Sequence, residues 1–287
     1  MNVSYELKLI REITGLSQEE LGKRLGVSRL TIINWEQNKV QIEETSVERI
    51  YEFAFKNHIF LNKLFEMNYI EANQSDNNVI VFHGAKKKII GDLDFNHSKK
   101  DNDFGKGVYF GENLDQAGSF ISSYEGSHIY VYSFNTLGLK GLRFKVSPEW
   151  MLTVAYYRGL INDYSDNKLV IDLVKKIEEC DYIIAPIADN KMYDIISEYV
   201  NGMITDKQCS HALSATDLDN QYVIKSSKAL KQLYLLRECY ISESERNEYD
   251  HFKRMISDLG ASKVRMALIE YKNQGKYIDE VLNERTK

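Results

Sequence analysis

The chain has 287 residues, of which 43% are hydrophobic, so it is long enough for two domains that each bury a core. It has no apolar run long enough to span a bilayer and no basic-then-apolar leader, so we expect a cytoplasmic protein that does not contact the membrane. Its net charge of −5 excludes a protein that binds nucleic acid through overall positive charge, so any such binding must be local.

The N-terminal part, residues 1–70, is predicted to form a compact all-α domain. Apolar residues recur at helical spacing from residue 7, and Ser17 with Glu20 forms the capping-box pattern that begins a second helix. A third helix is expected over residues 28–37. We expect one further long helix from residue 47 to about residue 70.

The segment from Ser17 to Glu36 closely resembles the helix-turn-helix of phage-repressor-like (Xre-type) domains. The resemblance covers about residues 5–60 and implies a recognition helix at residues 28–37. It also implies which side chains contact DNA: Gln18 would touch phosphate, and the side chains facing base edges would be Arg29, Leu30, Ile33 and Asn34.

Two features leave open whether this domain binds operator DNA or a protein such as an antitoxin. Residues 1–70 contain nine Lys plus Arg against ten Glu, whereas operator-binding domains usually present a basic face. Leu30 and Ile33 are apolar and could meet either thymine methyl groups or another protein. A homodimer would help DNA binding, because one half-site with so few positive charges should bind weakly.

After a polar segment at residues 71–78, which we interpret as a linker, the pattern changes to short strands separated by helices. Residues 79–240 are therefore predicted to form an α+β domain, and residues 241–287 a charged helical extension with one apolar face that needs a partner. Strands are expected at residues 79–82, 108–110, 127–134, 181–185, 219–225 and 228–234, and helices at residues 115–124, 148–163, 167–179, 192–200 and 206–212.

The stretch Asp103–Gly111 is unusually rich in glycine and follows a strand that ends in His83 and Gly84. Gly105 and Gly107 permit a positive φ angle or the close approach of another group. Taken alone, a tight turn between two strands explains this stretch better than a ligand-binding loop does.

Three separate segments together look like the His-Tyr-Glu group of the ADP-ribosyltransferase superfamily: His83-Gly84, Gly105–Phe110 and Asn220–Ile224. More closely, Asp103–Gly107, Ala185–Asp189 and Gln221–Val223 resemble an uncharacterised bacterial domain family placed in that superfamily. The resemblance covers about residues 79–237 and implies an ADP-ribosyltransferase-like fold with NAD as substrate. The three cysteines are widely spaced and indicate no metal site.

The resemblance also implies a role for each residue of the site. His83 would bind the adenosine ribose of NAD, and the backbone of Gly84 would bind the nicotinamide carboxamide. Tyr109 would stack on nicotinamide, with Gly105 and Gly107 shaping the approach to it.

The sequence departs from the family pattern at Gln221, where a glutamate is usual. A neutral amide can hold a hydroxyl group but offers neither charge nor a general base, so we expect transfer of a single ADP-ribose unit at most. The activating base could be the substrate, Asp103 or Asp189, and capping of a helix or turn is the alternative role for either aspartate.

These features give one main hypothesis and two alternatives. The main one is an NAD-dependent mono-ADP-ribosyltransferase fused to a helix-turn-helix, acting as a toxin or phage-defence effector on a protein, RNA or DNA acceptor. The first alternative is a transcription regulator whose degenerate transferase domain senses NAD or ADP-ribose. The second makes the helix-turn-helix a protein-docking module.

Overall fold

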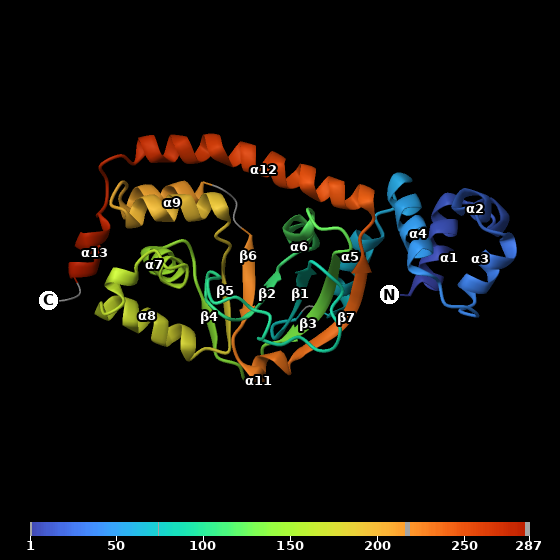
Figure 1. Ribbon diagram of the computed structural model, residues 1–287, viewed down its shortest axis with the longest axis horizontal. Coiled ribbons are helices and arrows are strands. Elements are labelled where there is room, and N and C mark those ends of the chain that lie inside the picture. Colours follow the sequence, from blue (N-terminus) through green and yellow to red (C-terminus); the bar gives the residue numbers. More distant parts are fainter. Residues whose placement is uncertain (1, 74, 216–218, 285–287) are drawn as a thin grey trace. The chain divides into compact units, whose positions relative to one another are not determined.

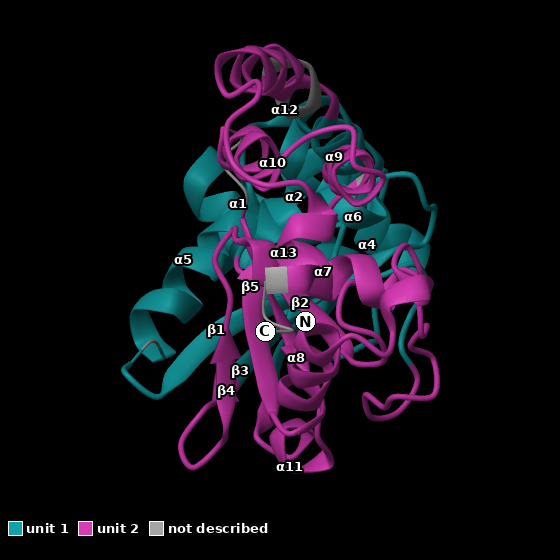
Figure 2. Cartoon of the chain, turned by 90° about the vertical axis from the view of Figure 1, so that its left-hand side faces the viewer, with its two compact units in different colours: residues 1–89, 113–133, 235–253 teal, residues 90–112, 134–234, 254–287 magenta. Residues whose placement is uncertain are grey.

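The computed structural model describes residues 2–73, 75–215 and 219–284, with the backbone alone at residues 190, 256–259 and 284. The chain divides into two compact units, shown in different colours in Figure 2. Unit 1 comprises residues 1–89, 113–133 and 235–253, and unit 2 comprises residues 90–112, 134–234 and 254–287. Each unit is therefore assembled from segments that lie far apart in the sequence.

Unit 1 begins with five helices, labelled in Figure 1 where there is room: α1 (Val3–Thr14), α2 (Gln18–Leu25), α3 (Arg29–Glu36), α4 (Glu44–Lys56) and α5 (Leu61–Asn73). They enclose a core in which Leu7, Leu21, Ile32 and Ile50 are completely buried. The predicted all-α N-terminal region is thus confirmed.

The start of α2 agrees with the prediction from the local sequence. The Ser17 hydroxyl accepts a hydrogen bond from the Glu20 amide (3.2 Å), and the Glu20 carboxylate accepts one from the Ser17 amide (2.9 Å), which completes the predicted capping box. The single helix predicted over residues 47–70 is wrong, because α4 ends at Lys56 and α5 begins at Leu61. His58 takes a left-handed conformation (φ 59°) between them, without the glycine or proline that would mark such a break in the sequence.

The rest of unit 1 is a mixed α/β part. It holds β1 (Asn78–Ala85), α6 (Leu114–Ile121), most of β3 (His128–Asn135) and of β7 (Leu233–Tyr240), and the start of α12 (Glu243–Glu270). The strand order is β1-β3-β7, and α6 covers it with the buried Leu114 and Ile121. The linker and domain limits expected from the sequence stay predictions: α5 extends to Asn73, β1 begins at Asn78, and residue 74 lies outside the described residues.

Unit 2 contains strands in the order β4-β5-β6-β2: β4 (Gly141–Arg143), β5 (Tyr182–Pro186), β6 (Asn220–Ile224) and β2 (Val108–Gly111). β4 and β5 are parallel, whereas β6 is antiparallel to both β5 and β2. The register places Ala185 on one side of Gln221 and Gly111 on the other. Gln221 therefore occupies an interior position of this part of the sheet.

The helices of unit 2 pack on a core in which Trp150, Phe104 and Tyr199 are fully buried. They are α7 (Pro148–Tyr157), the 3-10 helix η1 (Asn162–Tyr164), α8 (Lys168–Glu178), α9 (Asn190–Val200), α10 (Asp206–Ser214), α11 (Ser227–Leu230) and α13 (Ile278–Glu284).

Two expectations for this region are wrong, and one strand was not predicted. The helix predicted over residues 148–163 ends at Tyr157, where Gly159 takes a positive φ. Residues 227–230 are helical, and the last strand begins only at Leu233. β4 was not predicted, because it has three residues and little apolar content.

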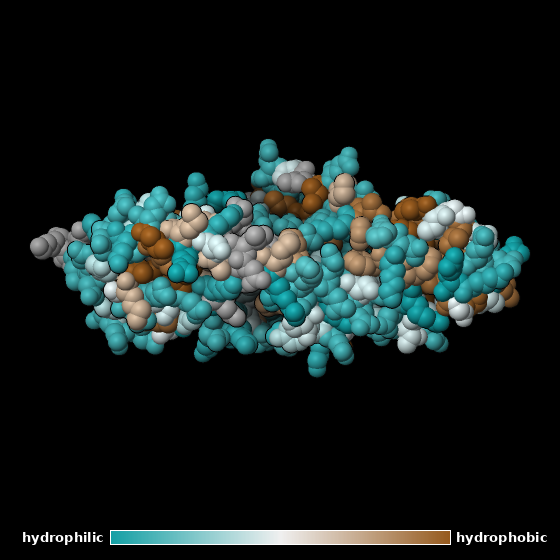
Figure 3. Space-filling model, turned by 90° about the horizontal axis from the view of Figure 1, so that it is seen from above, coloured by the Kyte–Doolittle hydropathy of each residue, from teal (hydrophilic) through white to brown (hydrophobic). Residues whose placement is uncertain are grey.

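The end of α12 places an apolar face against its own chain. Val264, Ala267 and Leu268 pack on the core of unit 2, so the partner predicted for this face is the α/β region itself. Met266 and Ile269 stay largely exposed. Figure 3 shows hydrophobic residues in small groups among hydrophilic ones on the face that it draws. No helix in the described part of the chain is both long enough and apolar enough to span a membrane.

Candidate functional site

The helix-turn-helix presents the first turn of α3 to solvent. Gly22 of α2 lies close to the turn, and a Cβ there would stand 2.8 Å from the Val27 carbonyl oxygen, so a larger residue would push the two helices apart. Ser28 caps α3 by accepting a hydrogen bond from the Thr31 amide (3.1 Å). Arg29, the residue after this cap, is exposed. The N-terminus of α3 is therefore held by its cap, while side chains of its first turn remain accessible.

The residues predicted to face DNA differ in exposure. Arg29 and Leu30 are exposed, with Leu30 at 64%, whereas Ile33 and Asn34 are half-buried. A single exposed leucine is common on protein surfaces, so its exposure shows only that this side chain is accessible. The exposed first turn of α3 is therefore the part best placed to contact another molecule.

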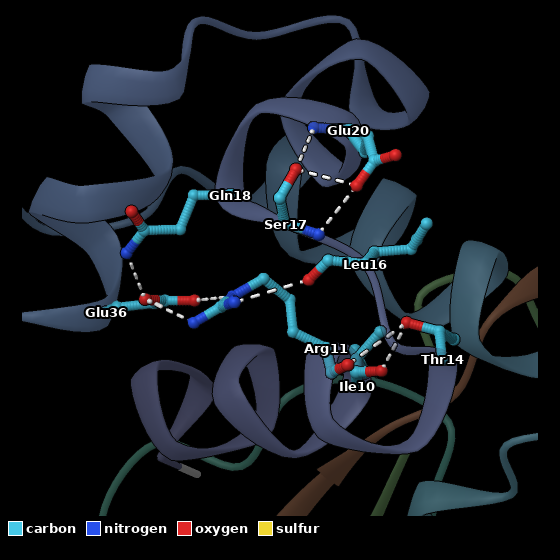
Figure 4. Close-up of polar contacts among 8 residues, drawn as sticks. All are labelled: Ile10, Arg11, Thr14, Leu16, Ser17, Gln18, Glu20 and Glu36. Atoms are coloured by element: carbon cyan, nitrogen blue, oxygen red, sulfur yellow. Dashed lines mark hydrogen bonds and ion pairs between the residues drawn. The ribbon is translucent and has the colours of Figure 1, made fainter.

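Gln18 takes part in a polar network that ties α2 to α1 and α3, shown in Figure 4. Its amide nitrogen donates to Glu36 (2.8 Å), and Arg11 pairs with the same buried carboxylate at 2.6 Å. Arg11 also donates to the Leu16 carbonyl (3.2 Å). The phosphate contact expected of Gln18 stays a prediction, while its amide nitrogen is used within the fold.

A buried triad joins these helices to strand β7 within unit 1. Arg237 of β7 donates to Glu6 of α1 (2.6 Å) and to the hydroxyl of Tyr51 of α4 (2.9 Å), and that hydroxyl donates to Glu6 (2.8 Å). Glu6 is completely buried and Arg237 is 4% exposed. The Arg237 guanidinium also lies 3.7 Å from the centre of the Phe65 ring. Burial, with the nearby Glu6 charge, raises the pKa of Tyr51 well above its usual value, so the Tyr51 hydroxyl keeps the proton that it donates to Glu6.

Helix α5 makes a second connection, to α6. Glu66 accepts a hydrogen bond from the Leu114 amide at the start of α6 (2.7 Å), and Lys63 pairs with Asp115 (2.8 Å). A carboxylate at a helix N-terminus satisfies an otherwise unpaired amide and favours the helix dipole. The last helix of the N-terminal region therefore fixes the start of α6.

His83 and Gly84, the candidates for NAD binding in unit 1, lie near the end of β1, and both are half-buried. Gly84 packs against α6, and a Cβ there would stand 2.7 Å from the Ala117 carbonyl oxygen. Packing alone therefore requires glycine at this position. Its predicted contact with a carboxamide stays a prediction.

The candidates in unit 2 lie on and beside a tightly braced loop. Gly105 has φ of +69°, and a Cβ at Gly107 would stand 2.7 Å from Val223, so both conformational expectations for these glycines are confirmed. The hydroxyl of Tyr109 donates to the Gly105 carbonyl (2.7 Å) and accepts from the amide of Phe104 (3.2 Å). Tyr109 thereby braces the loop with its hydroxyl, while its ring packs against the core.

Lys225, the residue directly after β6, holds the same loop in place. Its ammonium donates to the carbonyls of Phe104 and Lys106, each at 2.6 Å. Burial lowers the pKa of this lysine below its usual value. Sequence reasoning overlooked Lys225, because its partners are backbone carbonyls far away in the chain.

The most buried polar group of the loop is Asp103, which is 5% exposed. One carboxylate oxygen accepts from the Gln221 side-chain nitrogen (2.8 Å) and from the Ala188 amide (3.2 Å), and the other accepts from Arg158 Nε (2.7 Å). Gln221 donates with the same nitrogen to the carbonyl of Pro186 (3.2 Å). The structure thus brings together Asp103 and Gln221, which the sequence singled out, and adds Arg158, which it did not.

This geometry limits what Asp103 can do chemically. Both of its oxygens already accept hydrogen bonds from within the fold, one from Arg158 and the other from Gln221 and the Ala188 amide. Asp189, the other candidate base, caps α9 by accepting from the Met192 amide (2.9 Å), which is the alternative role considered for it. Both aspartates thus hold parts of the fold in place, and a role of either as a base stays a prediction.

Glu112, at the end of β2, is a further residue that the sequence did not indicate. Its carboxylate accepts from the backbone amide of Asn220 (2.5 Å) and from its side chain. It therefore fixes the start of β6, directly before Gln221. No cluster of metal-binding side chains occurs among the residues that the structure describes.

Comparison with known families gives two matches. A family model described as "Helix-turn-helix" matches residues 7–53, and one described as "Protein of unknown function (DUF3990)" matches residues 79–235. No curated protein and no solved structure matches the chain. The first match confirms the helix-turn-helix predicted from the sequence. The second delimits the α/β region and names no activity for it.

Proposed function

Because the chain belongs to the family described as "Protein of unknown function (DUF3990)" and carries a helix-turn-helix before that domain, we propose that it is a transcription regulator. It binds operator DNA through α3, and its α/β region binds NAD or ADP-ribose as a signal. The proposal combines a confirmed motif with the nucleotide-binding pattern of the sequence.

The observation that carries the proposal is the matched helix-turn-helix with an exposed first turn of α3. A recognition helix reads bases with its N-terminal residues in the major groove. Arg29 is suited to a guanine edge and Leu30 to a thymine methyl group. Both side chains are exposed and thus accessible for these contacts.

The Glu6–Tyr51–Arg237 triad supports a regulatory role for the α/β region. It connects α1 and α4 with β7, in the unit that also contains β1 and His83. The contact gives a physical route by which a ligand at β1 would alter the placement of the helices.

DNA binding is tested by selecting sequences from a random duplex pool and measuring affinity for the selected duplex by fluorescence anisotropy. We expect Arg29→Ala to weaken binding by roughly 10- to 100-fold, as for the loss of one base contact. Arg265→Ala, which removes an exposed arginine of unit 2, is the matched control and leaves binding unchanged. If no sequence is enriched from the random pool, the proposal is contradicted.

A second candidate function is transfer of a single ADP-ribose unit from NAD, with Tyr109 and Gln221 of unit 2 binding the substrate. It is favoured by the pairing of β2, which carries Tyr109, directly with β6, which carries Gln221. Nicotinamide release, and transfer of labelled ADP-ribose to protein, RNA or DNA of a lysate, measure it. Release above the solvent rate would favour transfer over sensing, and bound but intact NAD would favour the regulator.

A further inference from the structure

We propose that Asp103 is a positioning residue that fixes the orientation of the Gln221 amide and makes glutamine, rather than glutamate, the residue required at this position. The ligand-facing part of the inference rests on the proposed binding of NAD or ADP-ribose. The pairing itself is a property of unit 2.

The amide orientation follows from its neighbours. A carboxylate and a backbone carbonyl can only accept hydrogen bonds, and these are the groups facing the Gln221 side chain, from Asp103 (2.8 Å) and Pro186 (3.2 Å). The amide nitrogen has two hydrogens and supplies one to each. A rotated amide would place its oxygen against both acceptors, so only one orientation is favourable.

Arg158 holds the orienting group in place. Its guanidinium lies 2.5 Å from Asp103 and also donates to the Ala188 carbonyl (2.7 Å), while the Ala188 amide donates back to Asp103 (3.2 Å). These contacts fix the position of the Asp103 side chain from two sides. The oxygen that faces Gln221 therefore stays where the Gln221 nitrogen can donate to it.

With its nitrogen engaged, Gln221 can offer a ligand only its carbonyl oxygen. That oxygen is a hydrogen-bond acceptor, and a ribose hydroxyl of NAD or ADP-ribose is a suitable donor. The fixed amide thus retains the hydroxyl-accepting chemistry of a carboxylate oxygen without its negative charge. Such a group binds the ribose. It does not stabilise the positive charge that develops on the ribose when the bond between ribose and nicotinamide breaks.

Glutamate would not be tolerated next to Asp103. Two carboxylates at 2.8 Å repel each other, and one of them would have to bind a proton. Arg158 contacts Asp103 and supplies one charge, which cannot neutralise both. Gln221 is therefore the complement of a buried aspartate, and its presence does not by itself indicate that the site has decayed.

The test is a double-mutant cycle with ADP-ribose as the probe. Gln221→Glu should lower the affinity, measured by calorimetry at pH 8, by at least tenfold and lower the Tm. Adding Asp103→Asn, which supplies an amide donor at position 103, should recover at least threefold of that affinity and part of the Tm. The recovery is incomplete because the Ala188 amide then faces the new amide group.

The matched control is Gln208, which is as buried as Gln221 (6% exposed each) but donates to the Leu268 carbonyl. Gln208→Glu should also lower the Tm, and Asp103→Asn should give it no rescue. Wild-type affinity in Gln221→Glu, or strictly additive effects of the two changes on both affinity and Tm, would overturn the inference.

The proposed function can fail separately from this pairing. A wild-type protein that binds neither ADP-ribose nor NAD would overturn the nucleotide-binding proposal and the ligand-facing half of this inference. In that case the Tm cycle still decides the pairing: non-additive Tm values support it and additive values overturn it.

Discussion

Two arginines of this protein pair with buried carboxylates, and they differ in how far water reaches them. Arg237 in unit 1 is 4% exposed and its partner Glu6 is completely buried. Arg158 in unit 2 is 22% exposed on its side chain, although its partner Asp103 is 6% exposed. The first network is closed on all sides, whereas the second is open at its arginine.

The difference separates a structural contact from a candidate binding site. Burying an ion pair costs the desolvation of both charges, so such a pair acts by specifying how elements pack. A ligand from solvent cannot reach its charged groups. An open network keeps one polar edge that another molecule can reach. The Glu6–Arg237 pair therefore places α1 against β7, whereas the Asp103–Gln221 pair belongs to the network on which the proposed ligand site rests.

The largest expected effect comes from breaking the closed network. Arg237→Met leaves Glu6 as an unpaired buried charge, which should lower the free energy of unfolding of unit 1 by about 3–5 kcal/mol. Urea unfolding followed by Trp35 fluorescence, in a Trp150→Phe background, measures unit 1 alone. The apolar pair Glu6→Leu with Arg237→Met should recover most of the loss. An unchanged midpoint in Arg237→Met would contradict a paired, buried Glu6.

The next effect concerns pH and a buried carboxyl in the same unit. Glu245 contacts Asn62 and Tyr249, and burial raises its pKa from 4.5 to about 7. A raised pKa favours the protonated carboxyl in the folded state. Its stabilising effect is therefore complete below pH 4.5 and is lost as the pH rises to about 7.

Unit 1 should lose roughly 3 kcal/mol of stability over that pH range, at about 1.4 kcal/mol for each pKa unit. Glu245→Gln cannot ionise, so it should flatten this part of the profile. Urea unfolding at a series of pH values compares the two proteins. A wild-type profile as flat as that of the variant would show that Glu245 titrates normally.

Breaking the open network should cost less. In Arg158→Met, Asp103 keeps its bonds from Gln221 and the Ala188 amide and gains access to water through the space left by the partly exposed arginine. We expect a loss of about 1.5–3 kcal/mol, as for hydrogen bonds to a charged group. Trp150 fluorescence in a Trp35→Phe background reports on unit 2. A loss equal to that of Arg237→Met would remove the distinction between the two networks.

The smallest effect tests a local signal that involves neither network. Ser17→Ala removes the cap of α2 and should destabilise unit 1 by about 1 kcal/mol. Ser123→Ala, at an exposed serine of unit 1, is the control and should change little. Equal unfolding midpoints for the two variants would mean that the capping box adds nothing measurable.

Prediction from the sequence succeeded where the physical cause is local. The capping pattern at Ser17, the positive φ of Gly105 and the start of α7 at Pro148 each depend on a few neighbouring residues. The break at His58 was overlooked because no glycine or proline marks it. Local pattern thus fixes element type better than it fixes where a long helix divides.

The contacts that define both networks could not be predicted in the same way. Glu6 and Arg237 are 231 positions apart, and Asp103 and Gln221 are 118 apart. Nothing in the spacing of charged residues indicates such pairs, because each depends on the path of the whole chain. For Asp103 and Gln221, the resemblance to a nucleotide-binding family singled out both residues without indicating that they touch.

The central claim is that the protein is a DNA-binding regulator that responds to NAD or ADP-ribose without consuming it. The most direct test measures affinity for the selected duplex with and without saturating NAD, while chromatography follows the NAD concentration. We predict at least a fivefold change in DNA affinity with NAD intact, as expected for coupled sites. Unchanged affinity at saturating NAD, or steady loss of NAD with release of nicotinamide, would contradict the claim.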